Sequence, residues 1–161
     1  MAQNNIDHML SQYSSTILEA VKTLECKGRL EFYDRNLYTY IKTDNKFSYL
    51  TTEILAPSGF QLVPLMHKKF SPKSHISLMT NHEQDHIVHK KNVQCAYRKW
   101  RNVEIPFKIE MVEMTLLKIQ PKIICSFKIS SDKIESIRRD LGLEVTSDYY
   151  FMHITLCEKF L

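Results

Sequence analysis

The chain has 161 residues, of which 43% are hydrophobic and 25% are charged, and its formal net charge is +4. This size and composition predict one domain with its own core, spanning residues 1–161. The positive charge suits an anionic ligand but is too small to indicate binding of duplex nucleic acid. We find no run typical of a signal peptide or a membrane span, and the four cysteines lack the paired spacing of zinc or redox sites.

A helical pattern opens the chain, and strand-like runs follow it. Residues 6–27 carry apolar side chains at three-and-four spacing, which predicts an amphipathic helix ended by Gly28. Residues 30–33, 37–41 and 47–55 then form three strand-like runs separated by polar turns, which predicts hairpins.

The second half of the chain predicts long strands and one helix. Residues 81–92 are strongly polar, which indicates a loop or a short helix. Two long strands are expected over residues 103–119, with an interruption at Pro106, and over residues 123–129. Asp132 and Glu135 then predict a capping box for a helix that ends near Gly142. This mixed, mostly antiparallel order predicts the α+β class.

One four-residue pattern occurs twice, as His-Ile-Ser-Leu at residues 75–78 and His-Ile-Thr-Leu at residues 153–156. Residues two apart in a strand share one face, so each histidine should lie beside its own hydroxyl. The intervening apolar residues should then face the core. Alternatively, both histidines are only polar residues on solvated strand faces.

Phosphodiester cleavage needs a base, an acid and donors for the phosphate oxygens. Histidine can supply the first two functions near neutral pH, and hydroxyls can supply the donors. We therefore predict His75 and His153 as catalytic residues, and Ser77 and Thr155 as phosphate-binding residues. This interpretation requires no metal and no cofactor.

The repeated His-x-Ser/Thr pattern resembles the signature of the 2H phosphoesterase, or LigT-like, superfamily. The helix predicted over residues 131–143, followed by the approach to the second motif at 149–153, resembles the family's helix-then-strand arrangement. The resemblance covers most of the chain. It implies a two-lobed fold, with two mainly antiparallel sheets around a central cleft and helices outside them. The family commonly has an outer helix before the first motif, where this sequence predicts hairpin-like strands.

The resemblance also implies a substrate class. Compact, stand-alone members include viral and phage proteins that destroy nucleotide second messengers, and this Lys-, Ile- and Asn-rich chain resembles them. We therefore expect a metal-independent phosphodiesterase for 2′,3′-cyclic GMP-AMP or 2′-5′ oligoadenylate, acting in the cytoplasm, which is the host's if the protein is viral. The alternatives are an enzyme that processes RNA ends or 2′,3′-cyclic phosphates, and a module that sequesters a nucleotide. No duplex nucleic acid or membrane is expected as a partner.

Aromatic and basic residues near the motifs could contact a base or a second phosphate. These candidates are Tyr97, Arg98, Trp100, Tyr149, Phe151 and Lys73. An equally good interpretation of the segment 97–101 is that Trp100 anchors it to the core while its charges face water.

A competing motif lies at residues 82–86, where His-Glu-Gln-Asp-His matches the His-Glu-x-x-His pattern of zinc proteases. On a helix this spacing presents two zinc ligands and a general base. Its surroundings are polar on every side, however, so we expect a solvated segment and no metal site.

Overall fold

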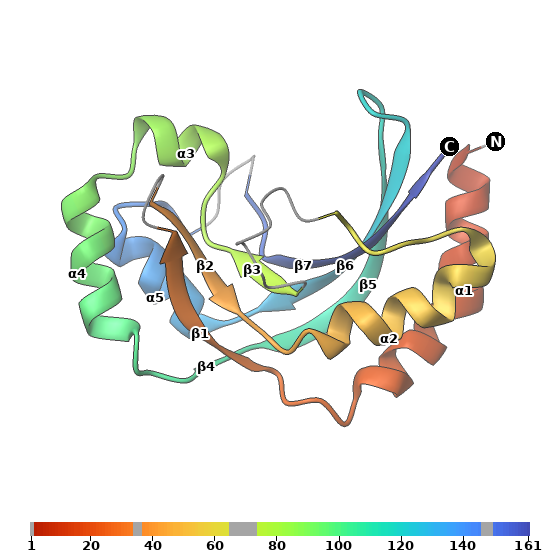
Figure 1. Ribbon diagram of the computed structural model, residues 1–161, viewed down its shortest axis with the longest axis horizontal. Coiled ribbons are helices and arrows are strands. Elements are labelled where there is room, and N and C mark those ends of the chain that lie inside the picture. The colour runs from red at the N-terminus through yellow and green to blue at the C-terminus, as the bar shows by residue number, and fades with distance from the viewer. Residues whose placement is uncertain (1, 34–36, 65–73, 146–149) are drawn as a thin grey trace.

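The computed structural model describes residues 2–33, 37–64, 74–145 and 150–161 (Figure 1). The elements are α1 (Ala2–Val21), β1 (Lys27–Tyr33), β2 (Tyr38–Lys42), α2 (Lys46–Leu55), the 3-10 turn η1 (Ala56–Ser58), β3 (His75–Ser77), α3 (Asn81–His86), α4 (Lys90–Trp100), β4 (Ile105–Pro106), β5 (Lys108–Leu117), β6 (Lys122–Ser130), α5 (Asp132–Asp140) and β7 (His153–Phe160). This mixture of helices and antiparallel strands agrees with the predicted α+β class. Among the helices described, none is long and apolar enough to cross a bilayer.

The strands form one antiparallel sheet in the order β4-β1-β2-β3-β7-β6-β5. The two motif strands, β3 and β7, are neighbours at its centre, where Ile76 pairs with Ile154. The prediction of two sheets therefore needs correction, because pairing of β3 with β7 joins the two halves into a single sheet.

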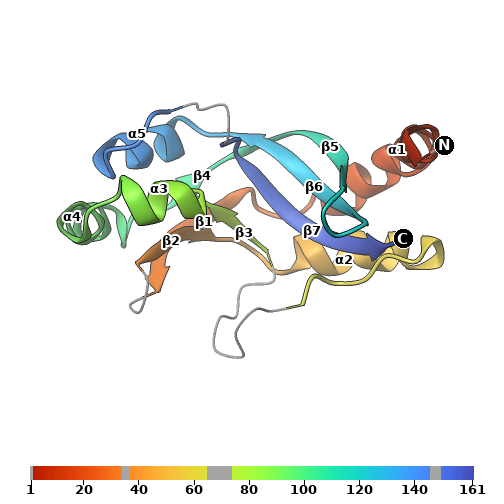
Figure 2. The same cartoon turned by 90° about the horizontal axis from the view of Figure 1, so that it is seen from above.

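Alternation of side chains gives this sheet one apolar face. Leu30, Ile41, Ile76, Ile154 and Phe127 are successive cross-strand neighbours on it, and all five are buried. Helices α4 and α5 lie at one end of the sheet, and α1 and α2 lie at the other (Figures 1 and 2). A shift of one residue in the strand register would expose these side chains, at a cost of about 1.5–3 kcal/mol of folding free energy for each one. Their burial therefore decides which residues point to the opposite, polar face.

Helix α2 differs from the prediction of a strand over residues 47–55. Its buried side chains include Phe47, Thr51 and Leu55, which are four positions apart and therefore follow the helical period. Aromatic and β-branched residues favour a strand locally, but packing against α1 and β7 stabilises the helix. The helix that the family resemblance implied before the first motif is thus present.

Helix α1 ends at Val21, so the prediction of a helix continuing to Gly28 was wrong. Gly28 instead lies in β1, where an added Cβ would be 2.3 Å from the carbonyl oxygen of Lys42. The glycine therefore allows close approach of β1 to β2.

Helix α5 begins at Asp132, one residue earlier than the predicted capping box with Asp132 as its N-cap would require. Ser131 is the N-cap, and its Oγ accepts a hydrogen bond from the backbone amide of Ile134. Ile134, Ile137 and Leu141 are fully buried, as their spacing predicted.

Candidate active site

The pairing of β3 with β7 brings the two motifs together on the polar face of the sheet. Because the middle isoleucines of the motifs lie opposite each other, antiparallel geometry places His75 opposite Thr155 and Ser77 opposite His153. All four side chains are half-buried. The structure thus gathers the four residues that the sequence predicted as catalytic or phosphate-binding.

Within this quartet, the two histidines occupy diagonal positions. In an antiparallel pair, Cβ atoms of directly opposed residues are about 4.5–5.5 Å apart, and those of diagonal residues about 7–8 Å. The rings of His75 and His153 can therefore approach one phosphate group from different sides. Ser77 and Thr155 occupy the other diagonal, where their hydroxyls can reach the same group.

His153 is oriented by a backbone carbonyl. Its Nδ1 lies 2.9 Å from the carbonyl oxygen of Phe151. Because a carbonyl oxygen only accepts, Nδ1 is the donor in this bond, which leaves Nε2 for exchange of a proton with a ligand. The ring of Phe151 lies beside the imidazole, with centroids 4.6 Å apart, and Phe151 is 53% exposed.

His75 is oriented by two aromatic side chains from β2. Its ring meets Tyr40 edge-on at a centroid distance of 5.7 Å and Tyr38 at 6.5 Å. The Nδ1 atom of His75 is buried. Packing against the two tyrosines therefore restricts this imidazole from the side of β2.

Tyr38 also holds the hydroxyl of the first motif, because its Oη is hydrogen-bonded to Oγ of Ser77. Burial raises the pKa of Tyr38, although the bond to Ser77 lowers it in part, so the phenol stays protonated at neutral pH. When the phenol donates to Ser77 Oγ, the serine proton remains available for a phosphate oxygen.

A family model described as Swiss Army Knife, 2H phosphoesterase domain, matches residues 39–159. The match covers well over half of the chain and includes both motifs. The chain belongs to the 2H phosphoesterase family. No curated protein and no solved structure matches the chain. The match to this family model confirms the predicted superfamily and the predicted phosphodiesterase activity.

A buried arginine braces the active-site strands of this 2H phosphoesterase. Arg138 in α5 is fully buried, and its Nη2 lies 2.7 Å from Oε1 of Glu83. Its Nη1 donates to the carbonyl oxygen of Leu78 at 2.5 Å, and its Nε donates to that of Glu144 at 2.8 Å. The guanidinium also stacks on Tyr150, 3.6 Å from the ring centroid. One side chain thus links α5 to the end of β3, to α3 and to the approach to β7.

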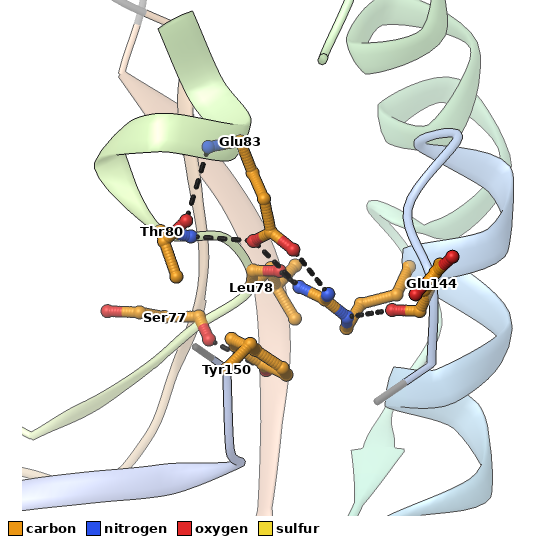
Figure 3. Close-up of polar contacts among 7 residues, drawn as sticks. Ser77, Leu78, Thr80, Glu83, Glu144 and Tyr150 are labelled. Atoms are coloured by element: carbon orange, nitrogen blue, oxygen red, sulfur yellow. Dashed lines mark hydrogen bonds and ion pairs between the residues drawn. The ribbon is translucent and has the colours of Figure 1, made fainter. Parts of the chain in front are cut away.

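Figure 3 shows how this brace reaches the first motif. The hydroxyl of Tyr150 donates to the backbone carbonyl of Ser77 at 2.9 Å. On the other side, Glu83 forms a capping box with Thr80 at the start of α3. Burial raises the pKa of Glu83, but hydrogen bonds from Arg138 and Thr80 outweigh it and hold this pKa below its usual value. The carboxylate is therefore ionised and paired at neutral pH.

The same contacts explain the His-Glu-x-x-His segment at residues 82–86. Its Glu83 carboxylate is turned toward Arg138, whereas His82 and His86 are exposed, with their rings 4.8 Å apart. In the described part of the chain, no group of three or more His, Cys, Asp or Glu residues could hold a metal ion. The glutamate serves the fold of the 2H phosphoesterase and is not placed as a protease base.

The aromatic and basic segment lies at the end of α4. Tyr97 packs on Phe32, whose side chain is on the apolar face of the sheet, opposite the histidines. Trp100 donates to Asp140 in α5 at 2.6 Å, and Arg98 is exposed. The structure therefore does not bring this segment to the motif quartet, and its contact with a ligand stays a prediction.

Of the remaining candidates, Phe151 adjoins His153, whereas Lys73 and Tyr149 lie outside the described residues. The sequence interpretation missed Tyr38, which binds Ser77, and Tyr150, which donates to the Ser77 carbonyl. A period of two along β2 would have placed Tyr38 on one face with Tyr40, but only the strand register puts that face beside the first motif.

Proposed function

We propose that this phosphodiesterase cleaves a small RNA-like nucleotide by acid–base catalysis between His75 and His153. The observation that supports the proposal is their diagonal position across β3 and β7, each beside a hydroxyl of the other motif. We further infer that the halves β4-β1-β2-β3 and β7-β6-β5 correspond to the two lobes of the family fold, with the cleft above β3 and β7.

In the proposed reaction, a ribose hydroxyl next to the scissile bond attacks phosphorus. One histidine removes the proton of that hydroxyl, and the other donates a proton to the departing oxygen as the bond to phosphorus breaks. The product is a 2′,3′-cyclic phosphate; alternatively, water attacks and opens an existing cyclic phosphate. Ser77 and Thr155 donate hydrogen bonds to the non-bridging oxygens, whose charge grows in the transition state.

For the substrate, we propose 2′,3′-cyclic GMP-AMP or 2′-5′ oligoadenylate, degraded in the cytoplasm. The exposed ring of Phe151 beside His153 supports a nucleotide, because an aromatic face can stack a base next to the scissile phosphate. The preference for second messengers comes from the resemblance to compact viral members of the family.

The test is incubation of the purified protein, in a metal chelator, separately with 2′,3′-cyclic GMP-AMP, its 3′,3′ isomer, 2′-5′ oligoadenylate and a 3′-5′ RNA oligomer, followed by chromatography. We expect selective loss of a 2′-5′-linked substrate. Tight binding of one nucleotide without turnover would indicate a sequestering module instead, and turnover of only the 3′-5′ RNA would indicate RNA processing.

The variants His75→Ala and His153→Ala should each abolish turnover and keep the native circular dichroism spectrum, because both side chains lie on the polar face. His86→Ala is the matched control, since this histidine is exposed on α3. Full activity in either motif variant would overturn the assignment. Loss of wild-type activity in chelator, restored by zinc, would favour the competing His-Glu-x-x-His motif.

A further inference from the structure

Each motif histidine has a lysine as its outer cross-strand neighbour. Lys42 in β2 lies opposite His75, and Lys128 in β6 lies opposite His153. Directly opposed residues of a sheet point to the same face. Both lysines therefore project from the polar face, one on each side of the motif quartet.

The ammonium groups of Lys42 and Lys128 lie at the surface and contribute little to the stability of the fold. Lys128 is exposed, and the side chain of Lys42 is 52% exposed. Lys42 Nζ lies 3.9 Å from Oε1 of Glu31, and Glu31 also accepts a 2.9 Å hydrogen bond from Tyr40. An exposed pair at this distance contributes little to stability. Both lysines are therefore available to an anionic ligand.

The surface next to Lys42 has further room and carries charges of both signs, because Glu25, Glu31, Asp44 and Glu104 line the same groove as its lysines and Arg29. Arg29 lies opposite Lys42 in β1, and both line a groove of about 680 Å³. Lys27 in the same groove is paired with Glu25 and Glu104. Arg29 and Lys42 continue the line of cross-strand neighbours that begins at His75, because Lys42 pairs with His75 and Arg29 pairs with Lys42.

Building on the proposed function, we propose that Lys42 and Lys128 bind anionic groups that flank the scissile phosphate, so the preferred substrate carries at least two phosphate groups. About three strand spacings and a two-residue offset separate the two lysine Cα atoms, which gives roughly 16 Å. The four motif side chains occupy the space between them. A phosphate held by either lysine therefore lies beside the reacting phosphate, as in an oligonucleotide, a cyclic dinucleotide or a 5′-phosphorylated nucleotide.

The experiment compares two probes that differ by one phosphate: adenosine 2′,3′-cyclic phosphate, and the same compound with a 5′-phosphate. Steady-state kinetics and calorimetric binding are measured for the wild type. We expect the two-phosphate probe to have a KM and a Kd about tenfold lower, as expected for one charge-assisted hydrogen bond. Added salt should reduce the difference.

The lysine variants test the residues themselves. Lys42→Gln or Lys128→Gln, whichever removes the lysine that holds the 5′-phosphate, should weaken binding of the two-phosphate probe while leaving kcat nearly unchanged, and the double variant should remove the preference. Lys128→Arg should retain it. Lys91→Gln, an exposed lysine on α4, is the matched control and should behave as the wild type.

The two proposals fail in different ways. Equal KM and Kd for both probes, or a preference that persists in the double lysine variant, would overturn the assignment of the lysines. Binding with the expected lysine dependence but without turnover of either probe would instead contradict the proposed hydrolysis of cyclic phosphates and leave the lysine assignment supported.

Discussion

At the scale of single residues, the two motif histidines are held by different means. His153 is oriented by a hydrogen bond to the Phe151 carbonyl, whereas His75 is packed against the tyrosine rings of β2. The two hydroxyls also differ, because Ser77 is bonded to Tyr38. Substitutions in β2 should therefore act on the first motif.

The first prediction concerns the hydroxyls that contact phosphate. Ser77→Ala and Thr155→Ala should each lower kcat by roughly ten- to a thousandfold, because each removes one donor placed for the transition state. Steady-state kinetics checks this, with the substrate that the chromatographic test of the proposed function identifies. An unchanged kcat in both variants would show that the hydroxyls do not stabilise the transition state.

The second prediction concerns Tyr38. Tyr38→Phe removes the hydroxyl bonded to Ser77 but keeps the ring beside His75. We expect kcat to fall by about tenfold, less than for Ser77→Ala, because the effect on phosphate is indirect. Tyr49→Phe, an exposed tyrosine on α2, is the control and should be silent. A Tyr38 variant with wild-type kcat would show that Ser77 needs no positioning.

At the scale of elements, Arg138 connects segments that local sequence does not join. It contacts α3 through Glu83, the end of β3 through Leu78, and Tyr150 before β7. Breaking a buried ion pair leaves the other charge without compensation, and this costs more than the pair itself contributes. The brace should therefore matter for stability and for the alignment of both motifs.

The third prediction follows from this brace. Arg138→Met should lower the free energy of unfolding by about 3–5 kcal/mol, measured by urea denaturation. Its neighbour Arg139 is exposed and pairs with Glu135 one helical turn away, so Arg139→Met should change stability by less than about 1 kcal/mol. Adding Glu83→Gln to Arg138→Met should restore part of the loss, because it removes the uncompensated carboxylate. Equal effects of the two arginine variants would argue against the brace.

At the scale of the whole molecule, two paired carboxylates make stability depend on pH. Contacts with Arg138 and Thr80 lower the pKa of Glu83 despite its burial. Burial likewise raises the pKa of Asp140, but hydrogen bonds from Lys99 and Trp100 outweigh burial and hold this pKa below its usual value. Each folded carboxylate therefore binds its proton less tightly than the unfolded chain does, and unfolding takes up protons in acid.

The fourth prediction is that the free energy of unfolding is highest above the ordinary carboxyl pKa values and falls as the pH is lowered from about 6 to about 3. Urea denaturation at a series of pH values measures this. In the double variant Arg138→Met, Glu83→Gln the slope should be smaller, because one of the shifted groups is gone. A stability that rises toward pH 3 would contradict the ionised pairs at Glu83 and Asp140.

The sequence by itself determined the two motifs and the faces of their strands, because the period of two in a strand is a local property. It also predicted β6 and the buried stripe of α5. It did not predict α2, since aromatic and β-branched residues at 47–55 favour a strand until tertiary packing selects the helix. Only the tertiary structure decided the strand order that pairs β3 with β7 and places Lys42 and Lys128 beside the histidines. Pairing between distant strands depends on the burial of a shared apolar face, and no local pattern encodes that register.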